Sequence, residues 1–378
     1  MGFVDIMGLC LNFLRKSLHI EIGQYMELTD PEIERPMTKQ AFSKARHKIS
    51  PDAFRELFEM TCDTVFDIDA FDRHKGWRIF AIDSTDLRLP PSKEILGIFK
   101  RSKATNPCPY ARASILCEVV SGFTAHAAIS TIEAGERDLA MEHLEYLASF
   151  KQSKDLILFD RGYPSKALLK YLSDKGFKYL MRTQKGFSQI IDRSDKRDFF
   201  VEIQGGKVRA LKLVLPSGEI ETLVTNLSRQ EFKTSEFMEL YHLRWAVETK
   251  YNTLKSKLDM ENFSGKTLVS VLQDFYATLF LSNIATTIKS EANEMIRKEN
   301  AGKALKHEYV ANENILIGRL KDKLILLMLN DDAEKRSLLL NKLISQMPYY
   351  RVSIVKGRQF KRKLIPSWRN RGKPKSAL

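Results

Sequence analysis

The spacing of apolar and polar residues changes along the chain and divides it into segments of different predicted secondary structure. Residues 1–75 have apolar residues at helical spacing and predict a helical N-terminal region. Residues 76–185 alternate short apolar runs with amphipathic segments. Strands are predicted at 77–83, 113–130 (two strands around a Ser121-Gly122 turn), 155–160 and 177–184, with helices at 137–150 and 164–176. This alternation predicts an α/β core with a mixed sheet.

The second half of the chain begins with a β-rich segment and then becomes helical. Residues 186–230 have turn signals at Gly205-Gly206 and Ser217-Gly218 between alternating β-formers, which predicts a small antiparallel insertion. The core is expected to resume at 231–290, and a helical C-terminal region follows at 291–345. The most apolar stretch, Leu268–Ile288, is interrupted by polar residues and predicts a core helix rather than a membrane span.

Charge suggests the class of partner. The 378 residues have a formal net charge of +14, which favours a polyanion, with nucleic acid first and an anionic membrane surface second. The predicted tail, 346–378, includes ten Lys or Arg and no acid from Arg351 onward, so it either binds DNA phosphates or only increases solubility. The N-terminal region is either a small DNA-binding unit or a helical cap with a solvated basic face; its basic residues are Lys39, Lys44, Arg46 and Lys48.

Other composition features exclude several classes of site. The four cysteines form no CxxC pair, which excludes a zinc ribbon and fits reduced thiols in a cytoplasmic protein. No glycine-rich nucleotide fingerprint occurs, so no nucleotide cofactor is expected. His126 and His143 have no second ligand at metal spacing and are expected to be ordinary core or surface histidines.

Two acids follow buried apolar runs. Asp83 follows the run at 78–82, and Asp160 follows the run at 156–159. Carboxylates at the carboxyl ends of strands lie where α/β proteins bind ligands. Each acid alone also fits a turn former or a helix N-cap.

A third acid belongs to a segment with informative spacing. At about 100° per residue, Tyr241, Arg244, Glu248 and Lys255 fall on one arc of a helix, with Trp245 at its border. A neighbouring apolar stripe would pack on the core; its members are Leu240, Leu243, Val247, Tyr251, Leu254 and Leu258. An ordinary surface ladder of charged residues is the alternative interpretation.

Three converging carboxylates repel one another unless cations neutralise them. Carboxylate oxygens suit hard ions, so Asp83, Asp160 and Glu248 are candidate ligands of two Mg²⁺ or Mn²⁺ ions. A pair of such ions is the usual device for phosphoryl transfer, and nearby cationic side chains would bind the phosphate.

These residues resemble a known family. IDSTD around Asp83, LFDRGY around Asp160 and Y-x2-R-x3-E-x6-K from Tyr241 to Lys255 are similar to the three signature blocks of IS4-family insertion-sequence transposases. The resemblance covers roughly residues 35 to 265 and includes the β-rich stretch before the Glu. It implies a ribonuclease-H-like core whose catalytic, metal-binding triad is Asp83, Asp160 and Glu248.

The resemblance also implies partners and an activity. Tyr241, Arg244 and Lys255 would bind DNA phosphates near the cleaved end, and Trp245 lies beside them. Arg161 and Tyr163 complete the second block and would position it. The implied activity is metal-dependent cut-and-paste transposition, in which the enzyme cuts at terminal inverted repeats and joins the ends to target DNA.

The expected active form is a homodimer on paired DNA ends in the bacterial cytoplasm, with no membrane partner. Two alternatives remain at this point: a structure-specific nuclease on the same core, and a non-catalytic DNA-binding regulator derived from a transposase.

Overall fold

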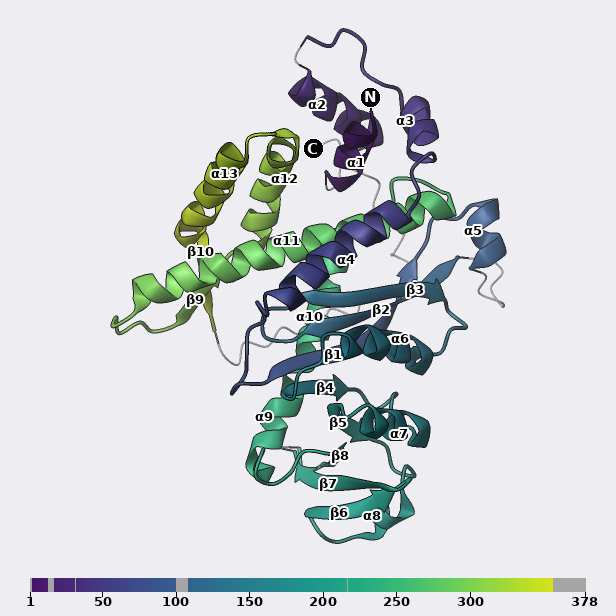
Figure 1. Ribbon diagram of the computed structural model, residues 1–378, viewed down its shortest axis with the longest axis vertical. Coiled ribbons are helices and arrows are strands. Elements are labelled where there is room, and N and C mark those ends of the chain that lie inside the picture. The colour runs from purple at the N-terminus through teal and green to yellow at the C-terminus, as the bar shows by residue number, and fades with distance from the viewer. Residues whose placement is uncertain (1, 13–16, 31, 100–107, 216, 356–378) are drawn as a thin grey trace.

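The computed structural model describes residues 2–12, 17–30, 32–99, 108–215 and 217–355 (Figure 1). Eight strands form one sheet in the order β3-β2-β1-β4-β5-β8-β7-β6. Its first five strands are β1 (Arg78–Arg88), β2 (Tyr110–Glu118), β3 (Thr124–Thr131), β4 (Asp155–Phe159) and β5 (Lys178–Thr183). β2 runs antiparallel to β1 and β3, while β4 and β5 run parallel to β1 and to each other. This mixed arrangement confirms the predicted α/β, ribonuclease-H-like fold class.

The β-rich segment extends this sheet instead of forming a separate one. Its strands are β6 (Asp198–Ile203), β7 (Gly206–Val214) and β8 (Ile220–Thr225), and β8 pairs antiparallel with β5. Both hairpins turn where the sequence predicts, because Gly205 and Gly218 adopt positive φ angles of 74° and 86° that glycine tolerates without strain.

Helices cover both faces of the sheet. α6 (Glu136–Ala148) packs on β1, β2 and β3, and α10 (Trp245–Asn252) packs on β1 and β2; Figure 1 shows α6 in front of these strands and α10 behind them. α7 (Lys166–Asp174) packs on β5 and β7 and begins where the Ser165 hydroxyl accepts a hydrogen bond from the Leu168 amide. Two shorter helices are α5 (Lys93–Ile98) and α8 (Gln189–Arg193). β1 and β4 are therefore buried on both sides, which explains their continuous apolar runs.

One long helix joins the terminal regions to the core. α11 (Leu268–Asn300) lies beside α4 (Asp52–Asp67) in Figure 1 and also contacts α1 (Phe3–Leu11). The polar residues that interrupt its apolar sequence make buried contacts: Gln273 bonds the backbone of Arg46 and Ile49, and Asn283 bonds the backbone of Thr124. α11 is long and apolar enough to cross a membrane, but 56% of its most apolar segment is buried inside the protein. It packs as the predicted core helix.

The remaining elements flank α11. The N-terminal region also contains α2 (Leu18–Thr29) and α3 (Lys39–Arg46). The C-terminal region contains β9 (Glu308–Ala311), α12 (Glu313–Leu329), α13 (Ala333–Gln346) and β10 (Arg351–Ile354). β10 pairs antiparallel with β9, so the first residues of the predicted basic tail belong to the folded part. Residues 356–378 of that tail lie outside the described residues.

A buried ion pair connects the first strands of the core. The Arg78 guanidinium is fully buried and donates to both oxygens of Asp155, at 2.6 and 2.7 Å. Asp155 also accepts a hydrogen bond from the Gln152 amide. The pair therefore holds the start of β1 against the start of β4.

We expect Asp155→Ala to reduce the free energy of unfolding by about 3 kcal/mol, because it leaves a buried guanidinium without its main counter-ion. Urea unfolding followed by circular dichroism measures this loss. Lys170→Ala is the control, since it removes a solvent-exposed ion pair to Asp174 and should change stability little. Equal effects of the two substitutions would contradict the role given to the buried pair.

Candidate active site

The first two acids meet where the parallel pairing of β1 and β4 ends. The last paired residues are Ile82 and Phe159, and Asp83 and Asp160 are the next residues of their chains. The sequence predicts that the first strand ends at Asp83, which is wrong. β1 continues to Arg88 because it still pairs with β2 on its other side. Both carboxylates nevertheless lie at the same edge of the β1–β4 pair, as expected.

Asp83 is partly buried at this edge, and its environment disfavours the ionised carboxylate. Burial is the main cause that raises its pKa from 3.8 to about 6. The carboxylates of Asp160 and Glu248 raise this pKa further, whereas a hydrogen bond from the Ser84 amide and the charge of Arg244 lower it. The charges of both other members of the predicted triad therefore act on the Asp83 carboxylate.

The segment from Tyr241 to Lys255 is less regular than the predicted single helix. α9 (Phe237–His242) is followed by a tighter turn in which the amides of Arg244 and Val247 bond the carbonyls three residues earlier. α10 follows, and Thr253–Lys257 is a π-helical turn. The predicted apolar stripe is still buried, with Leu243 only partly so; its fully buried members are Leu240, Val247, Tyr251, Leu254 and Leu258.

Arg244 forms an ion pair with Glu248, at 2.8 Å between guanidinium and carboxylate. Its guanidinium lies 5.8 Å from the ring centroids of both Tyr241 and Trp245. The Tyr241 hydroxyl lies 3.4 Å from the Asp160 carboxylate. Two predicted site residues, Arg244 and Tyr241, thus connect Glu248 to Asp160 through direct contacts.

The Lys255 side chain contacts the second half of β1. Its ammonium donates to the Thr85 hydroxyl at 2.7 Å and to the Asp86 carbonyl at 2.8 Å. The predicted common arc assumed regular α-helical rotation, and the wider π-helical turn changes the direction of this side chain. Lys255 therefore contacts the far half of β1, beyond Asp83.

The remaining predicted residues differ in exposure. Arg161 is exposed, and Trp245 is 47% exposed, so both are accessible to a partner. Tyr163 is buried, with its hydroxyl 3.4 Å from that of Ser84. Its burial fits the positioning role that the resemblance implies and excludes it from the accessible surface.

Arg137 was missed by sequence reasoning as a contributor to the site. Its guanidinium donates hydrogen bonds to the carbonyls of Gly162, Tyr163 and Pro164, at 3.0, 3.1 and 3.4 Å. The sequence shows only a charged residue at a helix start. The contact joins α6 to the loop after Asp160, and it depends on the tertiary fold.

Tyr251 supports the other side of the site. Its buried hydroxyl donates to the carbonyl of Asp83 at 2.8 Å and lies 3.0 Å from the carbonyl of Ala113. This contact fixes α10 against β1 and β2 at the level of the first acid. Sequence reasoning identified Tyr251 only as a member of the apolar stripe.

Carboxylate oxygens dominate the donor set of this edge. Across the described ranges, no group of three or more His, Cys, Asp or Glu side chains lies close enough to hold a metal ion. His126 and His143 are buried with ring nitrogens 2.7 Å apart and act as core residues, as expected. The three acids still fit a hard divalent cation by their chemistry. Burial is the main cause of the raised pKa of Asp83, and the charges of Asp160 and Glu248 add a repulsion that a cation would relieve.

Comparison with known proteins identifies the family. The sequence profile of the transposase DDE domain matches residues 74–284, which is more than half of the chain and includes all three acids. The chain belongs to the transposase DDE domain family. No curated protein matches the sequence.

Among solved structures, this DDE-domain protein is similar to a piggyBac transposase, determined by cryo-EM as a synaptic complex with hairpin DNA. The two chains are 13% identical with a TM-score of 0.44, and the match covers 71% of this chain. It spans 57% of the length of the piggyBac chain.

We expect Asp83→Asn to stabilise the metal-free protein by about 3 kcal/mol at pH 8, because the pKa of Asp83 rises from 3.8 to about 6. The raised pKa means that ionised Asp83 costs stability above pH 6, whereas below pH 3.8 the residue is protonated in both the folded and unfolded states. Urea unfolding in EDTA at several pH values measures the difference between the proteins. If the difference in unfolding free energy between Asp83→Asn and wild type does not shrink as the pH falls from 8 to 4, the burial assigned to Asp83 would be contradicted.

We expect Arg137→Ala to increase amide hydrogen exchange in residues 160–165 severalfold, because the loop loses its three hydrogen bonds to this side chain. Hydrogen exchange with mass spectrometry measures this change. Lys166→Ala, an exposed residue next to the loop, is the control. Unchanged exchange in the Arg137 variant would show that the guanidinium does not order the loop.

Proposed function

We propose that this protein is an IS4-type, cut-and-paste DNA transposase. The observation that carries the proposal is that Asp83 and Asp160 directly follow the last paired residues of β1 and β4, and that Arg244 and Tyr241 link Glu248 to Asp160, all inside the matched DDE domain. The substrate would be DNA with terminal inverted repeats, and the product would be the element joined to target DNA.

The proposed cofactor is two Mg²⁺ or Mn²⁺ ions held by Asp83, Asp160 and Glu248. When bound, such ions polarise a phosphate and lower the pKa of an attacking hydroxyl. One oxygen of Glu248 is engaged by Arg244. The exposed Arg161 and Trp245 are the side chains proposed to contact the DNA at this edge. Arg244 is only 5% exposed and is proposed to bind a phosphate that enters beside Glu248.

The buried groups of the site have a supporting role in this proposal. Tyr251 binds the carbonyl of Asp83, Tyr163 contacts the hydroxyl of Ser84, and Arg137 holds the loop after Asp160. Preorganised carboxylates lower the cost of arranging the reacting groups. The proposed active form is a homodimer on paired DNA ends in the bacterial cytoplasm, with further DNA contacts from the basic residues of 356–378.

The test uses purified full-length protein, DNA carrying the sequences that flank its gene, and Mg²⁺ with an EDTA control. Wild type should release a fragment with discrete ends and join it to added target DNA. Glu248→Gln should reduce release more than ~100-fold, because a metal-binding carboxylate contributes several kcal/mol to the rate.

Glu239→Gln is the matched control, since this exposed residue of α9 loses the same charge outside the site. Scattered nicking without joining would replace the proposal with a nuclease. DNA binding without cleavage in either metal would replace it with a non-catalytic regulator.

A further inference from the structure

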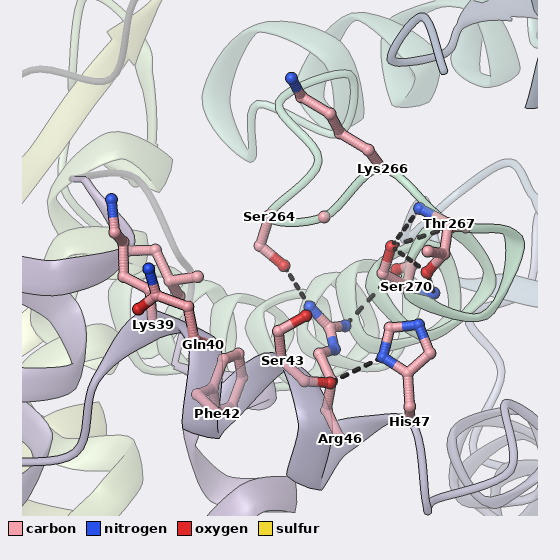
Figure 2. Close-up of a pocket in the computed structure, with 12 residues that line it drawn as sticks. Lys39, Gln40, Phe42, Ser43, Arg46, His47, Ser264, Lys266, Thr267 and Ser270 are labelled. Atoms are coloured by element: carbon pink, nitrogen blue, oxygen red, sulfur yellow. Dashed lines mark hydrogen bonds between the residues drawn. The ribbon is translucent and has the colours of Figure 1, made fainter. Parts of the chain in front are cut away.

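A cavity of about 220 Å³ lies between α3 and the loop that precedes α11 (Figure 2). Its two walls come from segments more than two hundred residues apart in the sequence. The lining residues are Leu18, Lys39, Gln40, Phe42, Ser43, Arg46, His47, Ser264, Gly265, Lys266, Thr267 and Ser270. No Asp or Glu is among them, whereas Lys39, Arg46 and Lys266 are cationic.

Arg46 forms the base of this cavity and is fully engaged. It is 2% exposed and donates to Gln273, Ser264 and Asp274 at 2.8, 2.5 and 2.9 Å. The sequence pattern groups Arg46 with the basic residues of a possible DNA-binding unit. The structure places it instead as an internal tie between α3 and α11, so it holds the two walls together.

Lys39 and Lys266, the other two cationic residues of the cavity, are not buried as Arg46 is. Lys39 and Lys266 are exposed, and across the residues that the structure describes neither makes a hydrogen bond or an ion pair with its ammonium group. Figure 2 shows that they come from the two opposite walls. The His47 ring bonds the Ser43 carbonyl through Nδ1, at 2.6 Å. Two uncompensated charges therefore flank a hollow lined by hydroxyl groups.

The backbone amides of Leu268 and Ser270 at the start of α11 are not free to bind an anion in the cavity. The Leu268 amide donates to the Glu94 carboxylate at 2.9 Å, and the Ser270 amide donates to the Thr267 hydroxyl. These groups are satisfied inside the protein. Any anion in the cavity would be bound by side chains, above all by the two lysines.

The chain connects this cavity directly to the active site. After Glu248, Lys255 contacts Thr85, then Glu261 accepts a hydrogen bond from the Arg88 amide, and Ser264 reaches Arg46. This stretch follows the second half of β1 away from Asp83.

We propose that Lys39 and Lys266 form a phosphate-binding site for the backbone of duplex DNA, separate from the three acids. The inference rests on the proposed function, which supplies DNA as the partner. Duplex DNA fits better than a free anion because both lysines are exposed at the surface, where the backbone of a polymer can reach them, and the protein has a net charge of +14. The site increases affinity and orientation without reading sequence.

The test measures duplex DNA binding by fluorescence anisotropy at several salt concentrations, with full-length Glu248→Gln protein to prevent cleavage. Adding Lys39→Gln and Lys266→Gln should weaken binding at least threefold and reduce the slope of log K against log salt by about 2, one for each lost phosphate contact. Lys39→Arg with Lys266→Arg should retain wild-type affinity. Thermal unfolding checks that each variant is folded.

Lys303→Gln with Lys342→Gln is the matched control, because it removes two exposed lysines elsewhere and lowers the net charge equally. A loss no larger than in this control overturns the proposal. So does a cavity that binds inorganic phosphate in calorimetry while DNA affinity is unchanged by the Lys39 and Lys266 substitutions.

The cleavage assay separates this proposal from the function itself. Lysine-dependent DNA binding without any metal-dependent cleavage would contradict the transposase proposal and leave this site in place. Discrete cleavage with unchanged binding in the lysine variants would do the opposite.

Discussion

The parallel pairing of β1 with β4 is the constraint on which the rest of the site depends. It brings together residues that are far apart in the sequence and ends in register at Ile82 and Phe159. The next residue on each strand is an acid, so one backbone ladder sets the relative position of Asp83 and Asp160. The buried Arg78–Asp155 pair holds the other end of the same two strands. Contacts within the protein therefore fix both ends of this strand pair.

The third acid arrives on a helix that is fixed by a separate set of contacts. Tyr251 ties α10 to the backbone of β1 and β2, and the apolar stripe packs beneath it. Glu248 consequently faces the strand edge with Arg244 as its immediate counter-ion. Arg244 offsets part of the repulsion among the three acids, while burial and the charges of Asp160 and Glu248 still raise the pKa of Asp83.

Local patterns were sufficient to predict part of this structure. Apolar runs that end at Asp83 and Asp160 indicated two strands with acids at their ends, and the Gly205 and Gly218 turns marked the hairpins. Helical spacing around Glu248 predicted which side of the helix is buried. These features depend on residues near one another in the chain, for which backbone preference and burial act together.

Other features depend on contacts that no local pattern contains. The pairing of β8 with β5, the bonds from Arg137 to the loop after Asp160, and the internal role of Arg46 all join distant segments. The direction of Lys255 was missed for a different reason, because a π-helical turn interrupts the regular rotation on which the prediction relied.

The central claim is that Asp83, Asp160 and Glu248 act together as one site for divalent cations. Mn²⁺ binding to the full-length protein, followed by electron paramagnetic resonance, tests it most directly. The account predicts that wild type and Glu239→Gln bind Mn²⁺ alike, and that Asp83→Asn, Asp160→Asn and Glu248→Gln each weaken binding at least tenfold. Equal Mn²⁺ affinity in wild type and all three of these variants would contradict it.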